Sequence, residues 1–358
     1  MSDILATDIK IRVKPTPQSR LGQLDFENLR FGREFSDHMF QMEYKDGQWQ
    51  NAEIVPFANL SLNPATAVLH YGQSIFEGMK AYKCEDGQVI LFRPEANIRR
   101  MNISAERMCM PAIPEGVFRE ALVELMRLDA GWVPQSETGS LYIRPFLFAT
   151  DEFIGVKPGE SFRFMIFTCP VNAYYTAPVR VKIEMKYARA TPGGTGYAKA
   201  AGNYAASLYP ARLAQKMGYD QLVWTDALTH KYIEESGTMN VFFVTDEGLM
   251  TPPLGDTILA GITRDSVLTL ARDWGVPVVE RRIAVDELVE KLENGKVSDA
   301  FGAGTAATIA HIATIGYEGK DYDLPPVEQR EFSNKVLSYL NDYRKGRLED
   351  KFNWNLRV

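Results

Sequence analysis

The sequence predicts a mixed α/β protein, of the α+β class, built as two domains. Three observations lead to this prediction. The chain has 358 residues, 45% hydrophobic and 24% charged, which is long enough to bury two cores. Strand-like runs alternate with helical stretches in both halves. A Tyr- and Pro-rich break at 171–178 separates the halves, so we expect a small domain at 1–172, a linker at 173–180 and a larger domain at 181–358.

The N-terminal half is expected to form an antiparallel sheet with helices packed against it. Residues 1–28 are polar and predict an arm, and Asp46-Gly47 predicts a hairpin turn after the strand Asp37–Tyr44. Pro94 is typical of a helix start. The other expected strands are 52–59, 68–71, 88–92, 141–147 and 162–168, and the expected helices are 96–108 and 115–128.

The C-terminal half is expected to mix strands and helices. Pro210 interrupts the expected helix 205–217 and argues against its continuity. Gly275-Val276-Pro277 ends the expected helix 265–274, and Asp299–Ala307 leads into a glycine-broken turn. The other expected strands are 181–187, 221–225, 231–235, 241–245, 278–283 and 309–315, and the other expected helices are 285–292 and 327–343.

Charge and composition argue against several classes of function. A net charge of -6 argues against nucleic-acid binding. The chain has no run of roughly 20 apolar residues to span a membrane, and its N-terminus lacks the pattern of a signal peptide, so we expect a cytoplasmic protein. Cys84, Cys109 and Cys169 are far apart, which predicts reduced thiols and no metal site.

Lys199 is the strongest candidate for a reactive side chain. It lies between Ala198 and the small residues 200–202, which offer no solvating groups and leave room for a planar ring near the backbone. Burial disfavours a charged amine and so favours a nucleophilic lysine. A surface lysine in a glycine-rich turn would give the same local pattern, so the prediction depends on the other groups.

Two neighbouring carboxylates accompany this lysine. Pyridoxal phosphate (PLP) needs a lysine, an acid facing its pyridine nitrogen, a donor to its ring oxygen and a cup for its phosphate. Glu235 is the candidate acid, and a carboxylate there would keep the nitrogen protonated. Glu234 would point to the opposite face of the strand, so only one of the two can fill this role.

Several glycine turns could form the phosphate cup. Residues 261–264 open a helix, whose first backbone amides attract a dianion. Gly237-Thr238 and Gly304-Thr305 each place a hydroxyl beside a flexible glycine. Arg100 could add a positive charge, and Arg99 is the alternative. By themselves these features indicate a ligand that carries a phosphate.

Nine pieces of the sequence also carry a resemblance, and they are Asp37–Met39, Leu69–Tyr71, Phe76–Tyr82, Leu91–Pro94, Tyr142–Pro145, Gly202–Tyr204, Glu235–Asn240, Gly261–Arg264 and Phe301–Ala306. In this order they resemble the class IV (fold type IV) PLP-dependent aminotransferases, and among these the branched-chain amino acid aminotransferases. The resemblance runs from about Phe31 to the C-terminus. It implies an active site between two domains and amino transfer between L-leucine, L-isoleucine or L-valine and 2-oxoglutarate, in two half-reactions.

The resemblance also implies a role for individual positions. Lys199 would bind the cofactor and move a proton, Glu235 would face the pyridine nitrogen, and Tyr204 would donate to the ring oxygen. Arg144 would hold the side-chain carboxylate of glutamate. The other cofactor-binding positions would be Arg100, Thr238, Ile262, Thr263 and Thr305. The pocket would be lined by Phe31, Phe76, Tyr142, Tyr174, Thr238, Thr305 and Ala306, with Tyr71, Ile154 and Val156 from the second subunit of a homodimer.

Other functions stay open at this point. A D-amino acid aminotransferase or an aminodeoxychorismate lyase would have the same fold and another substrate. A non-catalytic PLP-binding protein is a third possibility. Mammalian branched-chain enzymes carry a redox-active Cys-x-x-Cys pair where this chain has Ala307 and Ala310, so we expect no regulation of that kind.

Overall fold

The computed structural model describes residues 9–358 apart from Ala173 and Thr176. The start of the expected arm and two residues of the expected linker therefore lie outside the described residues. The chain forms two compact units. The N-terminal unit comprises the described residues up to Tyr174 with Ala198–Ala201 and Asp342–Val358, and the C-terminal unit comprises Tyr175–Tyr197 and Gly202–Asn341.

The N-terminal unit is built on a sheet with the strand order β1-β3-β2-β8-β7-β5-β6-β18, with β4 paired to β7. Apart from the parallel pair β1 and β3, its neighbouring strands are antiparallel. Its strands are β1 (Arg12–Val13), β2 (His38–Lys45), β3 (Gln48–Pro56), β4 (Ser74–Phe76), β5 (Met79–Lys83), β6 (Val89–Phe92), β7 (Ser140–Ala149), β8 (Phe162–Val171) and β18 (Asn355–Arg357).

Asp46-Gly47 forms the predicted hairpin turn between β2 and β3. Lys45 pairs with Gln48, and the φ angles of Asp46 and Gly47 are 54° and 78°. Two positive φ angles in a two-residue loop are typical of the turn that matches the twist of paired strands. This turn fixes the register as far as the pair Glu43–Gln50, and an irregularity shifts it by one residue before the pair Gln41–Glu53.

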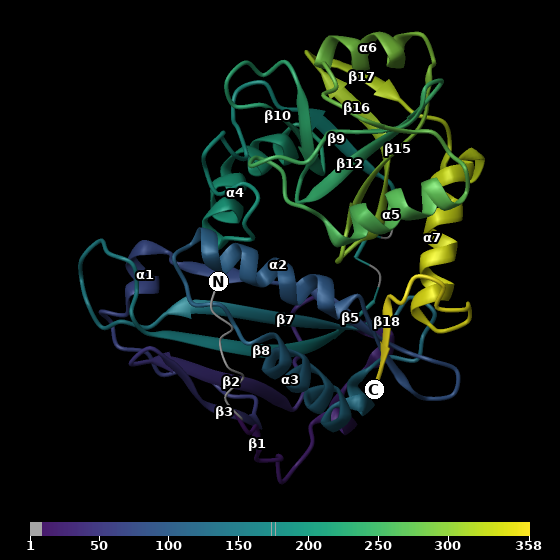
Figure 1. Cartoon of the computed structure of the whole chain (residues 1–358). Coiled ribbons are helices and arrows are strands. Elements are labelled where there is room, and N and C mark those ends of the chain that lie inside the picture. Colours follow the sequence, from purple (N-terminus) through teal and green to yellow (C-terminus); the bar gives the residue numbers. More distant parts are fainter. Residues whose placement is uncertain (1–8, 173, 176) are drawn as a thin grey trace. The chain divides into compact units, whose positions relative to one another are not determined.

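Two long helices, α2 (Pro94–Arg107) and α3 (Glu115–Leu128), cover one face of this sheet (Figure 1). The apolar side chains of α3 recur at helical spacing and are buried, which places one stripe of the helix against the strands. Leu141 and Ile143 of β7 belong to the same core. Because side chains alternate along a strand, Tyr142 and Arg144 lie on the opposite face of the sheet.

The C-terminal unit contains a second sheet, ordered β11-β10-β9-β16-β15-β12-β13-β14, with β17 paired to β16. Because β11 also pairs with β12, the six strands from β11 to β12 close into a ring. Such closure removes exposed strand edges. The strands are β9 (Val179–Ile183), β10 (Gln221–Thr225), β11 (Ile233–Ser236), β12 (Met239–Thr245), β13 (Gly248–Thr251), β14 (Val278–Glu280), β15 (Val297–Gly304), β16 (Thr308–Tyr317) and β17 (Lys320–Asp323).

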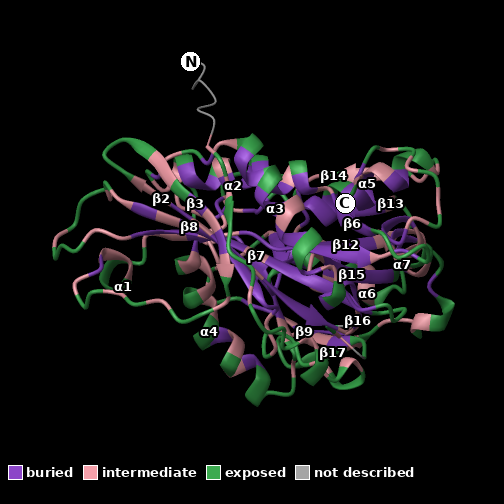
Figure 2. Cartoon of the chain, turned by 90° about the horizontal axis from the view of Figure 1, so that it is seen from below, coloured by how far each residue is buried: buried purple, intermediate pink, exposed green. Residues whose placement is uncertain are grey.

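The remaining helices are α1 (Ala67–Tyr71), α4 (Ala201–Lys216), α5 (Ile262–Asp273), α6 (Val285–Glu293) and α7 (Glu331–Arg344). Short 3-10 turns lie at Leu21–Gln23, Phe26–Asn28, Ala130–Trp132 and Val327–Gln329. Figure 2 shows that the strands are largely buried whereas α4 is mostly exposed, and in α4 only Pro210 and Ala214 are buried.

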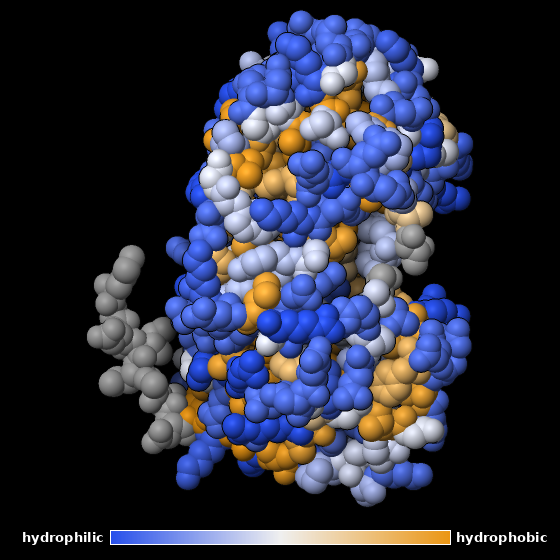
Figure 3. Space-filling view, turned by 90° about the vertical axis from the view of Figure 1, so that its right-hand side faces the viewer, coloured by the Kyte–Doolittle hydropathy of each residue, from blue (hydrophilic) through white to orange (hydrophobic). Residues whose placement is uncertain are grey.

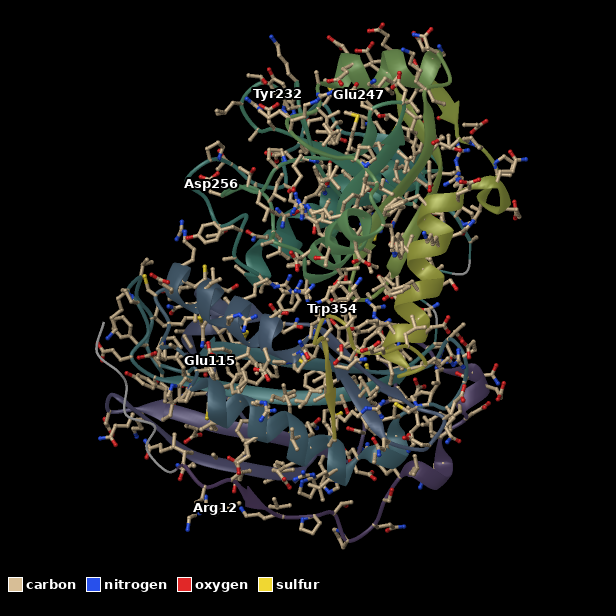
Figure 4. The ribbon with its side chains drawn as sticks, turned by 45° about the vertical axis from the view of Figure 1, so that its right-hand side comes forward. Arg12, Glu115, Tyr232, Glu247, Asp256 and Trp354 are labelled. Carbon is tan, nitrogen blue, oxygen red and sulfur yellow. The ribbon has the colours of Figure 1, made fainter. Side chains whose placement is uncertain are left out.

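Several element predictions were wrong. Residues 68–71 form part of the short helix α1 instead of a strand, and Asp299–Gly304 belong to β15 instead of a turn. The helix α4 continues through Pro210 and starts at Ala201, four residues earlier than expected. The segment after Asn341 groups with the N-terminal unit, because β18 pairs with β6 and Trp354, labelled in Figure 4, accepts a backbone hydrogen bond from Arg93.

The surface seen in Figure 3 is mostly hydrophilic, with smaller hydrophobic areas between the hydrophilic residues. Among the described helices, none combines the length and the apolar character that crossing a membrane would require. Cys84 and Cys169 are buried, Cys109 is exposed, and all three are free thiols.

Candidate active site

Lys199 is held by backbone contacts on both sides within the N-terminal unit. Its amide donates to the Ser104 hydroxyl of α2 at 2.9 Å, and its carbonyl accepts from the Phe76 amide at 3.1 Å. The next residue, Ala200, bridges to Ile75 of β4. The side chain is half-buried, and its Nζ lies 4.9 Å from the centre of the Phe76 ring. The chain therefore presents this amine from a fixed backbone.

A continuous line of side chains extends from this amine. The Arg144 guanidinium lies 4.6 Å from the centre of the Phe76 ring and donates to the Tyr142 hydroxyl at 3.0 Å. The Phe31 ring contacts those of Tyr142 and Tyr174 edge-on, at 5.0 and 5.1 Å between ring centres. The structure thus brings together Lys199 and all of the pocket residues predicted in this unit except those assigned to a second subunit.

Arg100 is buried, whereas Arg99 on the same helix is exposed. The Arg100 Nε and Nη2 atoms donate to the two oxygens of Glu77, at 2.7 and 2.8 Å. Burial alone would raise the pKa of Glu77, but the charge and hydrogen bonds of Arg100 bring that pKa below its ordinary value. Arg100 is therefore the arginine that points into the unit.

In the C-terminal unit, Glu235 is held on two sides. Its Oε2 forms an ion pair with Arg189 at 2.9 Å, and its Oε1 accepts from the Leu259 amide at 2.7 Å. Asn240 donates to the Leu259 carbonyl at 3.0 Å and keeps that loop in place. Glu234 instead accepts from Thr257 at 2.7 Å, and burial raises its pKa. The two carboxylates therefore have different environments.

A small hollow, open to solvent, lies within the C-terminal unit against Arg189 and Leu259, the two residues that hold this carboxylate. It is lined by Arg189, Asn203, Tyr204, Ser207, Gly237, Thr238 and Leu259. The predicted ring donor Tyr204 and the predicted phosphate contact Thr238 thus face one space. Among the described side chains, the buried Ser236 hydroxyl beside Gly237 finds no hydrogen-bond partner.

The glycine-rich segment before Lys199 is tied to the loop at 252–261. The Asp256 carboxylate accepts from the Gly193 amide at 2.6 Å, and its carbonyl accepts from the Tyr197 amide at 3.0 Å. Asp256 is labelled in Figure 4, on a loop at the edge of this unit. Arg189 adds a bond from Nη1 to the Thr257 carbonyl at 2.7 Å. These hydrogen bonds hold the glycine-rich segment and the loop at 252–261 in place around Glu235.

The other predicted phosphate contacts lie at the start of α5 and in the turn after β15. Ile262 and Thr263 are the first residues of α5 and both are buried. Gly261 precedes them, and a Cβ there would lie 1.9 Å from the Asn240 Oδ1 atom, so only glycine fits. Thr305 and Ala306 belong to the turn between β15 and β16 and are half-buried.

The residues assigned to a second subunit lie on the surface of the N-terminal unit. Tyr71, Ile154 and Val156 are 41%, 59% and 92% exposed. Their two segments are joined by a bridge between Thr66 and Glu152. They do not line the side-chain row around Lys199 in this chain.

Sequence reasoning missed Glu77 and Arg189, which hold Arg100 and Glu235. Glu77 lies inside a quoted sequence piece, and a carboxylate among apolar strand residues is a sign of a buried partner. Arg189 carried no such signal, because it lies in a loop whose path the sequence does not reveal. Groups of His, Cys, Asp and Glu that could hold a metal ion do not occur in the described part of the chain.

Residues 74–315 match the family model described as Amino-transferase class IV. The chain is a class IV aminotransferase. Branched-chain-amino-acid transaminase 1 of Bacillus subtilis (strain 168) is 44% identical to it over 339 residues, which cover 93% of this chain and 95% of the relative. At this identity over nearly the whole length, this class IV aminotransferase belongs to the branched-chain amino acid aminotransferases.

Solved structures agree with the fold of this class IV aminotransferase. The branched-chain aminotransferase of the archaeon Thermoproteus uzoniensis with norvaline matches with a TM-score of 0.75 and 26% identity, over 89% of this chain and 99% of the other. The branched-chain amino acid aminotransferase from Escherichia coli matches with a TM-score of 0.71 and 26% identity, over 89% of this chain and 98% of the other. The predicted α+β fold of type IV is confirmed.

The residues present fit PLP. Lys199 supplies a half-buried amine, and Glu235 supplies a buried carboxylate fixed by two donors. The hollow is lined by Tyr204 and Thr238, and Ser236, next to the lining residue Gly237, has a buried hydroxyl without a partner among the described residues. Each chemical group that PLP requires is therefore available in this chain.

Proposed function

We propose that this chain transfers the amino group between branched-chain L-amino acids and 2-oxoglutarate, with PLP as its cofactor. The observation that carries the proposal is the row from Lys199 through Phe76 and Arg144 to Tyr142 and Phe31. The row combines an amine, apolar rings and one guanidinium on a single surface. That combination suits two substrates, one with an apolar side chain and one with a charged side chain.

Lys199, Arg100, Tyr204, Glu235 and Thr238 would hold the cofactor, together with Ile262, Thr263 and Thr305. When bound, PLP supplies an electron-accepting ring that stabilises negative charge at the substrate Cα. The Lys199 amine would accept the proton from the substrate Cα. The same amine would later donate that proton again, on the same face of the cofactor ring. Glu235 would hold a proton at the pyridine nitrogen, and Arg189 and Leu259 would keep the carboxylate in place.

Arg144 would bind the side-chain carboxylate of glutamate or 2-oxoglutarate. Arg144 is half-buried, and only part of its donor fork is used by the bond from Nη2 to the Tyr142 hydroxyl, so a bound carboxylate could accept from the guanidinium. Leucine, isoleucine or valine would instead contact Phe31, Phe76 and Tyr142. The edge-on rings of Phe31 and Tyr174 would close the apolar end of this space.

We also propose that the enzyme is a homodimer in the cytosol. Leu69, Tyr71, Phe153, Ile154 and Val156 form an exposed apolar patch on α1 and the neighbouring loop. Such a patch is typical of a contact surface, and a second copy would cover it. Val156→Asp should therefore shift the protein toward monomer in sedimentation, and an unchanged dimer would remove the patch from the interface.

The function is tested by the visible spectrum of the purified protein with PLP. L-Leucine and L-glutamate should each remove the yellow band as the cofactor accepts the amino group, and D-alanine should leave it unchanged. A response to D-alanine alone would favour a D-amino acid aminotransferase. A yellow protein that responds to none of the three would favour the lyase or a binding protein.

A further inference from the structure

Glu77 is a fully buried carboxylate for which the proposed reaction has no use. It follows Phe76 at the end of β4 and is 0% exposed. Besides the two bonds from Arg100, it accepts from the Asn97 amide group at 2.8 Å and from the Gly78 backbone amide at 3.1 Å. Four donors thus converge on one side chain, which fixes its position.

Glu77 contacts two nitrogens of the Arg100 guanidinium, and this double contact restricts how the guanidinium can be oriented. A guanidinium is flat and rigid, so holding Nε and Nη2 together fixes the plane and the direction of the whole group. A buried ion pair contributes little to stability on balance, because both charges lose their water. Its main consequence here is therefore the orientation of Arg100.

The same elements also hold the lysine. The hydroxyl of Ser104, one turn after Arg100 on α2, donates to the Arg100 carbonyl at 3.0 Å and accepts from the Lys199 amide at 2.9 Å. Phe76, next to Glu77, donates to the Lys199 carbonyl at 3.1 Å. β4 and α2 therefore place Glu77, Arg100 and Lys199 in one rigid frame inside the N-terminal unit.

We propose that Glu77 is a positioning residue, which sets the direction in which the Arg100 guanidinium meets the phosphate of the cofactor. The proposal rests on the proposed function, in which Arg100 is a phosphate contact. Glu77 acts through Arg100 and need not touch the cofactor. Its loss should therefore weaken recognition of the phosphate and leave recognition of the ring intact.

The test measures the dissociation constants of PLP and of pyridoxal, which lacks the phosphate, by titrating the apoprotein and following absorbance. Glu77→Asp keeps the charge but is too short to reach both nitrogens of Arg100, and Glu77→Gln keeps the shape but loses the charge. Each variant should reduce the preference for PLP over pyridoxal about tenfold. The pyridoxal affinity of Glu77→Asp should stay close to that of the wild type, whereas its melting temperature should fall, because the shorter carboxylate leaves buried donors unpaired.

Two arginine variants separate the possible failures. Arg99→Ala, on the exposed side of α2, is the matched control and should keep the full preference for PLP. Arg100→Lys should lose part of it, and a wild-type preference in Arg100→Lys would overturn the phosphate role of Arg100 in the proposed function. If Arg100→Lys loses preference but Glu77→Asp does not, the role of Glu77 is overturned. Equal weakening of PLP and pyridoxal in Glu77→Asp would also overturn it, since that indicates a purely structural residue.

Discussion

Gly78→Ala should damage both stability and activity, because the new methyl group would collide with Tyr142. An ideal Cβ at position 78 lies 2.2 Å from the Tyr142 Oη atom, whereas ordinary contact begins near 3.4 Å. The hydroxyl must therefore retreat by about 1 Å. The retreat would break its 3.0 Å hydrogen bond from Arg144 and shift the ring away from Phe31.

The expected cost follows from these two effects. Inserting a methyl group into a packed site costs about 1–3 kcal/mol, and losing a hydrogen bond to a charged group costs about as much. We expect the free energy of unfolding of the apoprotein, measured in urea, to fall by about 3 kcal/mol. Since a displacement of roughly 1 Å in a pocket costs up to about 100-fold in rate, kcat/KM for L-leucine should fall tenfold or more.

A second substitution tests the reasoning directly. Tyr142→Phe removes the colliding oxygen, and the nearest remaining ring atom would lie 3.0 Å from the Cβ. Gly78→Ala should therefore cost at least about 1 kcal/mol less in the Tyr142→Phe background than in the wild type. An equal cost in both backgrounds would refute the collision. Gly116→Ala is the control, because its Cβ in α3 meets nothing within 4 Å and should stabilise by up to about 1 kcal/mol.

Three further predictions concern charged side chains. Lys199→Ala should abolish turnover and leave the unfolding curve of the apoprotein unchanged; turnover at the wild-type rate would remove Lys199 from the reaction. Arg144→Ala should reduce kcat/KM for L-glutamate at least tenfold more than for L-leucine, and equal losses would argue against a carboxylate contact. Burial, with nearby Arg344, lowers the pKa of Lys80 from 10.5 to about 7. Between these values the unfolded chain holds a proton that the folded chain lacks, so this residue makes the free energy of unfolding rise with pH by up to about 1.4 kcal/mol per unit. Urea unfolding of Lys80→Met across pH 7–10 should lose this increase, and a slope equal to that of the wild type would contradict the burial argument.

Elements with a strong internal period were predictable from the sequence. The helix α3 has the predicted bounds, because its apolar residues repeat at helical spacing and its whole stripe is buried. The short strands β13, β17 and β18 were missed, since three or four residues carry no measurable period. The start of α4 was predicted four residues late, at 205 instead of Ala201, and the helix runs through Pro210, which had argued against its continuity.

The choice between neighbouring charged residues was decided in different ways at two sites. Alternation along a strand predicted that only one of Glu234 and Glu235 could face a ligand, and the structure gives the two carboxylates different partners. The sequence alone did not decide whether Arg99 or Arg100 would contact the phosphate. The tertiary structure places Arg100 against Glu77 and leaves Arg99 exposed, because only one face of α2 packs onto the strands.

By itself the sequence predicted the fold class, singled out Lys199 as the candidate reactive lysine and carried the family resemblance that implies roles for its neighbours. Those features depend on local patterns, such as small residues around Lys199 or a period of apolar positions. Such patterns involve residues close together in the sequence and can be recognised without the structure. Only the tertiary structure decided which charges meet. The pairs Glu77–Arg100 and Glu235–Arg189 join residues 23 and 46 positions apart. Their contact depends on how strands and loops are brought together, and no spacing rule encodes that over such distances.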